Sequence, residues 1–178
     1  MRGNWDKFIT NLPLRFTITG FIFYFLVNIQ GAGQSVPDFN NLMHFTNWTV
    51  AHAHLALLGG FSILGQGLIA YIIPQIYKKP IWDKRLLNWQ YWLITVGFTG
   101  FFFALTFASF LQGQAWESGV PVINTVPYLR PHYVMRGFFG AMIMVSAFIQ
   151  AYSIWMTVKE DTSEKTRNEM KPFIQSAH

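Results

Sequence analysis

The 178-residue chain contains no cysteine, and only 12% of its residues are charged. The absence of cysteine excludes a disulfide, an iron–sulfur cluster and a thiolate ligand, which leaves histidine as the one strong transition-metal ligand type. Apolar residues make up 52% of the chain and aromatic residues 18%. This composition, with a mean hydropathy of +0.26, is far from that of an ordinary soluble domain and is typical of a membrane protein.

Four apolar segments are each long enough for a transmembrane helix, which needs about 20 residues. They span residues 12–29, 48–73, 89–111 and 133–158. Pro74 ends the second segment, and the stretch from Gly119 to Pro131, which holds three prolines, separates the last two. We therefore expect an all-α membrane protein, with residues 1–158 as a four-helix transmembrane unit and residues 159–178 as a charged tail. None of the four segments contains Asp or Glu, so the sequence offers no proton-relay carboxylate at membrane depth.

Basic residues are concentrated in the N-terminal stretch, in the loop after residue 73 and in the tail. The loop after the first segment has no Lys or Arg, and the loop after the third has only Arg130. The positive-inside rule then predicts that both termini are cytoplasmic and that the second segment starts near the outer face. The net charge of +5 thus indicates membrane orientation and no nucleic-acid partner. The first segment carries Thr17, Thr19 and Asn28, so we interpret it as a retained helix and not as a cleaved signal peptide.

His52 and His54 lie near the start of the second segment. Residues two apart on an α-helix are rotated by roughly 200°, so the two imidazoles point to nearly opposite sides and can each bind a different metal centre. Ionisable side chains inside a membrane segment are costly and usually functional. The pattern favours a helix that forms a wall between two haems, and the alternative is two histidines bonded to neighbouring helices. Ala56 and Gly59 follow on the face of His52, where they leave room for a macrocycle, serve close helix packing, or do both.

Three further polar residues flank these histidines. Asn40 and His44 precede the second segment, at the depth where haem propionates emerge, and could hydrogen-bond those carboxylates or be solvated loop residues. Arg136, near the start of the fourth segment, could pair with a propionate or extend to the membrane interface. Glutamines at positions 30, 66, 112 and 114 lie at or near membrane depth and could line a path for water or protons.

The stretch from Asn40 to Pro74 resembles the tenth helix of the catalytic subunit of haem–copper oxidases, and best that of the cbb type, or C-family, of cytochrome c oxidase. Residues 12–31 are similar to the preceding helix of that subunit, residues 86–116 to its eleventh and residues 124–158 to its last. The resemblance covers nearly the whole chain but only the last third of the catalytic subunit. It implies that the four helices complete a larger helix bundle.

The resemblance also implies a role for individual residues. His52 would be the proximal ligand of the high-spin haem b, where dioxygen binds, and His54 an axial ligand of the low-spin haem b. Asn40 and His44 match positions near the propionates of the high-spin haem. The implied function is reduction of dioxygen to water with electrons from cytochrome c, coupled to proton translocation, in the bacterial inner membrane. Gln30 stands where the cbb type often has a glutamate.

The remaining ligands of such an enzyme lie on earlier helices of the family. The histidines left in this chain are His44, His132 and His178, which cannot supply three copper ligands. The resemblance therefore implies a partner chain that carries the remaining helices and the copper, as in a subunit split into two polypeptides. It implies c-type cytochrome subunits as well, because the chain has no cytochrome c motif.

Two other functions fit the same histidines. A nitric oxide reductase component would use the same haem ligands with non-haem iron in place of copper. A non-catalytic dihaem membrane anchor would only pass electrons on, and both of its haems would be six-coordinate.

Overall fold

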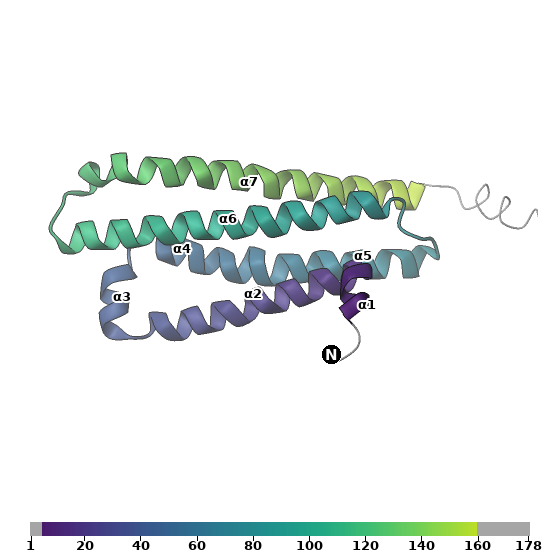
Figure 1. The fold of residues 1–178 in the computed structure, drawn as a ribbon, viewed down its shortest axis with the longest axis horizontal. Coiled ribbons are helices and arrows are strands. Elements are labelled where there is room, and N and C mark those ends of the chain that lie inside the picture. The colour runs from purple at the N-terminus through teal and green to yellow at the C-terminus, as the bar shows by residue number, and fades with distance from the viewer. Residues whose placement is uncertain (1–4, 160–178) are drawn as a thin grey trace, which may run out of the picture.

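The computed structural model describes residues 5–159, and the elements in this range are all helices. Long helices lie side by side and short ones join them (Figure 1). The elements in chain order are α1 (Trp5–Thr10), α2 (Leu12–Gln34), α3 (Pro37–Met43), α4 (Asn47–His54), η1 (Leu55–Ser62), α5 (Ile63–Tyr77), α6 (Lys84–Glu117) and α7 (Val122–Lys159). Because α4, η1 and α5 follow one another without a break, residues 47–77 form one continuous rod.

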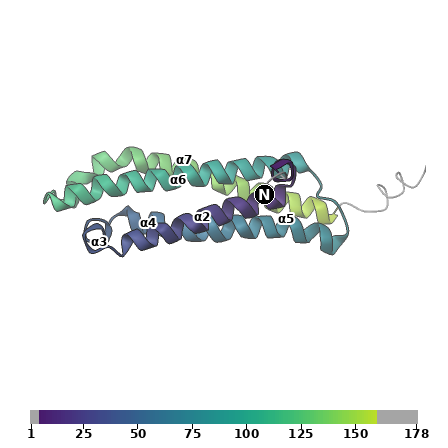
Figure 2. The same ribbon diagram turned by 60° about the horizontal axis from the view of Figure 1, so that its bottom comes forward.

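Four helical rods have the length and apolar composition of membrane-crossing helices: α2, the rod of residues 47–77, α6 and α7. The prediction of an all-helical chain with four spans is thereby confirmed. The rod of residues 47–77 packs against α2, and α6 packs along α7, as both ribbon views show (Figure 2). We call the end with α3, the start of α4 and the α6–α7 connection the histidine end, and the opposite end, with residues 78–83, the loop end (Figure 1).

The helices extend beyond the predicted spans, and the largest difference is at the start of α7. The prediction that residues up to Pro131 separate the last two segments is wrong, because α7 begins at Val122 and contains Pro127 and Pro131. Each proline removes one backbone donor from the helix. Pro131 lies four residues after Pro127, so the missing bonds fall one above the other on a single side of the helix. The remaining backbone hydrogen bonds of α7 can still form, so the helix continues through both prolines.

The core at the loop end is formed by α2, α5 and α6. Phe16 is fully buried and packs edge-on against Tyr91, with ring centroids 5.1 Å apart. The hydroxyls of Thr19 and Tyr91 lie 2.8 Å apart and share a hydrogen bond. Arg15 donates to Asn88 Oδ1 at 2.8 Å, and its guanidinium lies 4.2 Å from the centre of the Tyr91 ring. The loop end of α2 is thus held to α6 by bonds within the chain.

The π-helix η1 follows directly after the two histidines. Its wider turns, with i→i+5 bonding, displace the following residues from the spacing of an α-helix. A Cβ on Gly59 would lie 2.5 Å from Phe98 Cε1 and 3.1 Å from Phe23 Cβ. Gly59 therefore serves close packing of the rod against α2 and α6, and room for a macrocycle beside His52 stays a prediction.

Candidate functional site

His52 lies on α4 with its ring against the end of α2. Its Nδ1 is 3.1 Å from Gln30 Oε1. A Cβ on Gly31 would lie 3.4 Å from His52 Cε1, so the glycine lets the ring come close to the α2 backbone. When the amide oxygen of Gln30 accepts this hydrogen bond, the proton of the neutral ring is on Nδ1 and the lone pair is on Nε2.

His54 lies against α6. Its Nδ1 is 2.7 Å from the backbone oxygen of Val50. A carbonyl oxygen can only accept, so the Nδ1 of His54 carries the proton and Nε2 carries the lone pair of the neutral ring. The ring is 5.1 Å from that of Phe101 and tilted by 43° to it.

The two imidazoles therefore contact different helices, as expected for side chains two residues apart. Both arrangements resemble that of a metal-ligating histidine, which usually donates its other ring N–H to a carbonyl or a carboxylate. Among residues 5–159, neither Nε2 has a hydrogen-bond partner. Each ring thus presents one nitrogen that can bind a metal such as haem iron, and the two rings face different helices.

The start of α4 is fixed by α6 and α7. Asn47 donates from its backbone N at 2.9 Å and from its Nδ2 at 2.8 Å, both to Gln112 Oε1. Its Nδ2 also lies 3.0 Å from the hydroxyl of Tyr133. The hydroxyl of Thr46 caps the helix by accepting from Trp48 N at 3.2 Å. These bonds set the position of the histidine pair, and the sequence revealed Gln112 only as a polar residue at membrane depth.

Asn40 and His44 lie together at the histidine end. Asn40 is half-buried in α3, and His44 is the exposed residue that follows this helix, with its N bonded to Asn40 O at 2.8 Å. The His44 ring packs edge-on against Phe45, with centroids 4.4 Å apart. Within the described part of the chain, neither side chain has a hydrogen-bond partner, so both are free for a ligand.

Arg136 is exposed and sits 5.5 Å above the ring of Tyr133. Because Tyr133 bonds to Asn47 at the start of α4, Arg136 also belongs to the histidine end. It lies inside α7 and not near its start, since α7 begins at Val122.

Several buried polar atoms at the histidine end have no hydrogen-bond partner among the described residues. They are Gln30 Nε2, Trp48 Nε1, Thr106 Oγ1, Trp116 Nε1 and His132 Nδ1. Orphaned polar groups are costly in a membrane, where water does not replace the missing partner. The structure also shows no cluster of three or more His, Asp or Glu side chains within residues 5–159 that could hold a metal ion.

The described helices thus form a four-helix unit in which two neighbouring histidines contact different helices. Residues 1–164 match the family described as Cytochrome C and Quinol oxidase polypeptide I. The chain belongs to this family, the subunit I family of haem–copper oxidases, which confirms the resemblance seen in the sequence.

Curated relatives agree with this membership. The chain is 30% identical over 172 residues to the cytochrome c oxidase subunit 1 homolog, bacteroid, of Bradyrhizobium diazoefficiens, in an alignment that covers 92% of this chain and 31% of the relative. It is 28% identical to cytochrome c oxidase subunit 1 of Rhodobacter capsulatus, over 94% of this chain and 33% of the relative. It is 26% identical to the cbb3-type cytochrome c oxidase subunit CcoN1 of Stutzerimonas stutzeri, over 89% and 35%.

The chain thus spans about a third of the length of these relatives. A more distant relative is a nitric oxide reductase protein of Stutzerimonas stutzeri, at 23% identity over 77% of this chain. Membership of this family and the four candidate spans support a multi-pass membrane protein.

Proposed function

We propose that the chain forms the C-terminal part of the catalytic subunit of a cbb-type terminal oxidase, which reduces dioxygen to water with electrons from cytochrome c. In this proposal, His52 is the proximal ligand of the high-spin haem b and His54 is an axial ligand of the low-spin haem b. The observation that carries the proposal is the geometry of the pair: two rings held at Nδ1, against different helices, each with a free Nε2.

The residues around the pair fit two haems. Bound haem iron would supply the site of dioxygen binding and the electron relay, while this chain would hold and orient it. Gln30 and the Val50 carbonyl fix the ring nitrogens that carry protons. Asn40, His44 and Arg136 lie at the same end of the bundle and could bind the propionate carboxylates there.

The histidine end also indicates what the chain assembles with. Its orphaned buried polar atoms fit a surface that is completed by other helices. We therefore propose a partner chain with the remaining helices of the subunit, which holds the copper, together with c-type cytochrome subunits and membrane lipid. The complex would lie in the bacterial inner membrane with both termini of this chain in the cytoplasm.

A second candidate is a component of nitric oxide reductase, which the similarity to the nitric oxide reductase protein of Stutzerimonas stutzeri supports. It would use the same two histidines, so the second metal in the partner chain distinguishes the candidates: copper in the oxidase and non-haem iron in the reductase. A dihaem anchor without catalysis is the third candidate, and it predicts that neither haem binds carbon monoxide.

The test is histidine replacement in the assembled complex. We expect His54→Ala to abolish the low-spin haem absorbance, and His52→Ala to abolish carbon monoxide binding at the high-spin haem. Leu57→Ala, at an exposed position on the same rod, is the control and should keep both signals. Full haem spectra and turnover in both histidine variants would refute the proposal, and a wild-type complex that binds no carbon monoxide would favour the dihaem anchor.

A further inference from the structure

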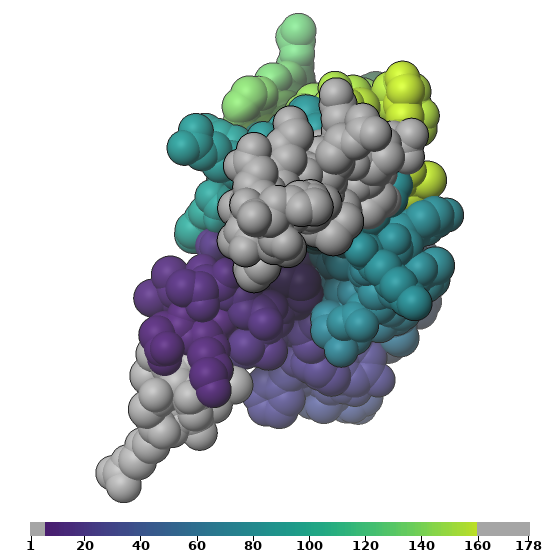
Figure 3. Space-filling model, turned by 90° about the vertical axis from the view of Figure 1, so that its right-hand side faces the viewer, coloured from purple at the N-terminus to yellow at the C-terminus, as the bar shows by residue number. Residues whose placement is uncertain are grey.

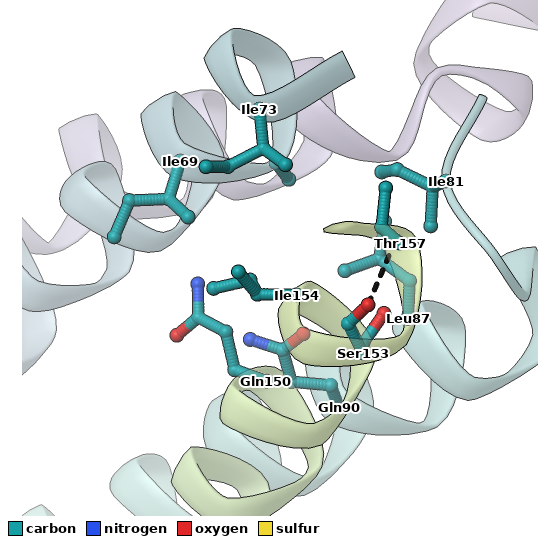
Figure 4. Close-up of a pocket in the computed structure, with 10 residues that line it drawn as sticks. Ile69, Ile73, Ile81, Leu87, Gln90, Gln150, Ser153, Ile154 and Thr157 are labelled. Atoms are coloured by element: carbon teal, nitrogen blue, oxygen red, sulfur yellow. Dashed lines mark hydrogen bonds between the residues drawn. The ribbon is translucent and has the colours of Figure 1, made fainter. Parts of the chain in front are cut away.

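A small cavity lies between α5, α6 and α7 beside the loop of residues 78–83, and Figure 4 shows the side chains that line it. Its volume is about 20 Å³. A single water molecule needs roughly 10–15 Å³ of such space. Most of its lining is aliphatic, and the polar side chains on it are those of Gln90, Gln150, Ser153 and Thr157.

Gln90 is fully buried, and half of its amide is unpaired. Its Nε2 donates to Gln66 Oε1 at 3.0 Å. Its Oε1 has no partner among the described residues. Exchanging oxygen and nitrogen in both glutamines would only leave a buried N–H of Gln90 unpaired in place of the oxygen. In either orientation, a residue that lines the cavity has one buried polar atom that needs a partner, and the described side chains do not supply it.

The other polar side chains around the cavity differ in whether they already have hydrogen-bond partners. Thr157 Oγ1 already accepts from Trp82 N at 3.1 Å and donates to Ser153 O at 2.7 Å. Gln150 makes only a long contact, from its Nε2 to Gln66 O at 3.5 Å. The Ser153 side chain is 4% exposed and lines the cavity. A molecule with two donors and two acceptors would therefore find Gln90, Gln150 and Ser153 within one small space.

We infer that this cavity is a binding site for one ordered internal water, held by Gln90 Oε1 and by the polar side chains of α7. Buried waters typically make about three hydrogen bonds to buried polar groups that have no other partner. The water joins α6 to α7. It lies next to the hydrogen bond between the side chains of Gln90 and Gln66, which joins α6 to α5. Among the described residues that line the cavity, none is ionisable, so the water is a structural bridge between helices. The inference does not depend on haem binding.

The test is a map of the assembled wild-type complex at a resolution that shows ordered waters. We expect one water peak in the cavity, at a hydrogen-bond distance of about 2.5–3.0 Å from Gln90 Oε1. No peak there, or a protein atom bonded to Gln90 Oε1, would overturn the inference.

A variant sharpens the test. We expect Gln90→Leu to remove the water peak and leave haem content unchanged, whereas Gln75→Leu, an exposed position on α5, should keep the peak. A peak that persists in Gln90→Leu would show that Gln90 does not hold the water. If Gln90→Leu does not assemble, the wild-type map decides alone.

Discussion

The two ends of the bundle differ in how many of their buried polar groups have hydrogen-bond partners. At the loop end, Arg15, Tyr91 and Thr157 bond to side chains or backbone of other helices or of the adjoining loop. At the histidine end lie five of the seven buried polar side-chain atoms that have no partner within residues 5–159, together with the free Nε2 atoms of His52 and His54. In the space-filling view of the loop end, the purple start of the chain lies at the lower left and the yellow end of α7 at the upper right (Figure 3). Within the described residues, the polar groups of the loop end are therefore largely paired with one another, and those of the histidine end are largely not.

Of the substitutions that test this difference between the two ends, the replacement of Gln112 should have the largest effect on stability and haem content. Gln112→Leu removes the acceptor of the Asn47 backbone N and one of the two partners of its Nδ2, and a donor left unpaired away from water costs about 1–3 kcal/mol. We expect a lower thermal unfolding midpoint of the complex and a loss of haem absorbance, because the start of α4 is released. Gln114→Leu, an exposed position on the same helix, is the control. Equal midpoints for the two variants would show that α6 does not anchor α4.

Replacing Gln30 tests how His52 is oriented. Gln30→Leu removes the acceptor of the ring proton, and loss of such an outer partner typically costs roughly 10–100-fold in metal affinity or activity. We expect the haem affinity at His52 to fall by this factor, which a carbon monoxide titration would show as lower haem occupancy. Gln30→Glu, which keeps an acceptor, should restore it, and Gln34→Leu, one turn further along α2, should have no effect. Unchanged occupancy in Gln30→Leu would mean that the ring is oriented by other contacts.

The smallest effect is expected at the loop end. Thr157→Val removes the hydroxyl that bonds Trp82 N and Ser153 O, which should lower the free energy of unfolding by about 1 kcal/mol. Haem spectra should not change, because the loop end lies apart from the histidines. Thr17→Val, which loses only a bond within its own helix, should be less destabilising. Loss of haem in Thr157→Val would show that the two ends are not independent.

The sequence predicted the four helical rods and the divergent directions of His52 and His54, because both follow from hydrophobic length and from the rotation per residue of an α-helix. It did not predict the contact of His52 with Gln30, or of Asn47 with Gln112, since these depend on how helices far apart in the chain pack together. The prolines of α7 were misleading for a related reason. Proline is a local signal for a break, but packing along α6 supports a helix that continues past Pro127 and Pro131.

The π-helix η1 affects how the histidines are oriented relative to the rest of the rod of residues 47–77. An α-helix turns by about 100° per residue, so a strictly regular rod would tie the facing of the histidines rigidly to that of Ile63 in the buried core of α5. The wide turns of Leu55–Ser62 change the rotation per residue between the histidines on α4 and Ile63 on α5. The direction of the histidines relative to the core residue Ile63 therefore differs from the direction that an uninterrupted α-helix would give.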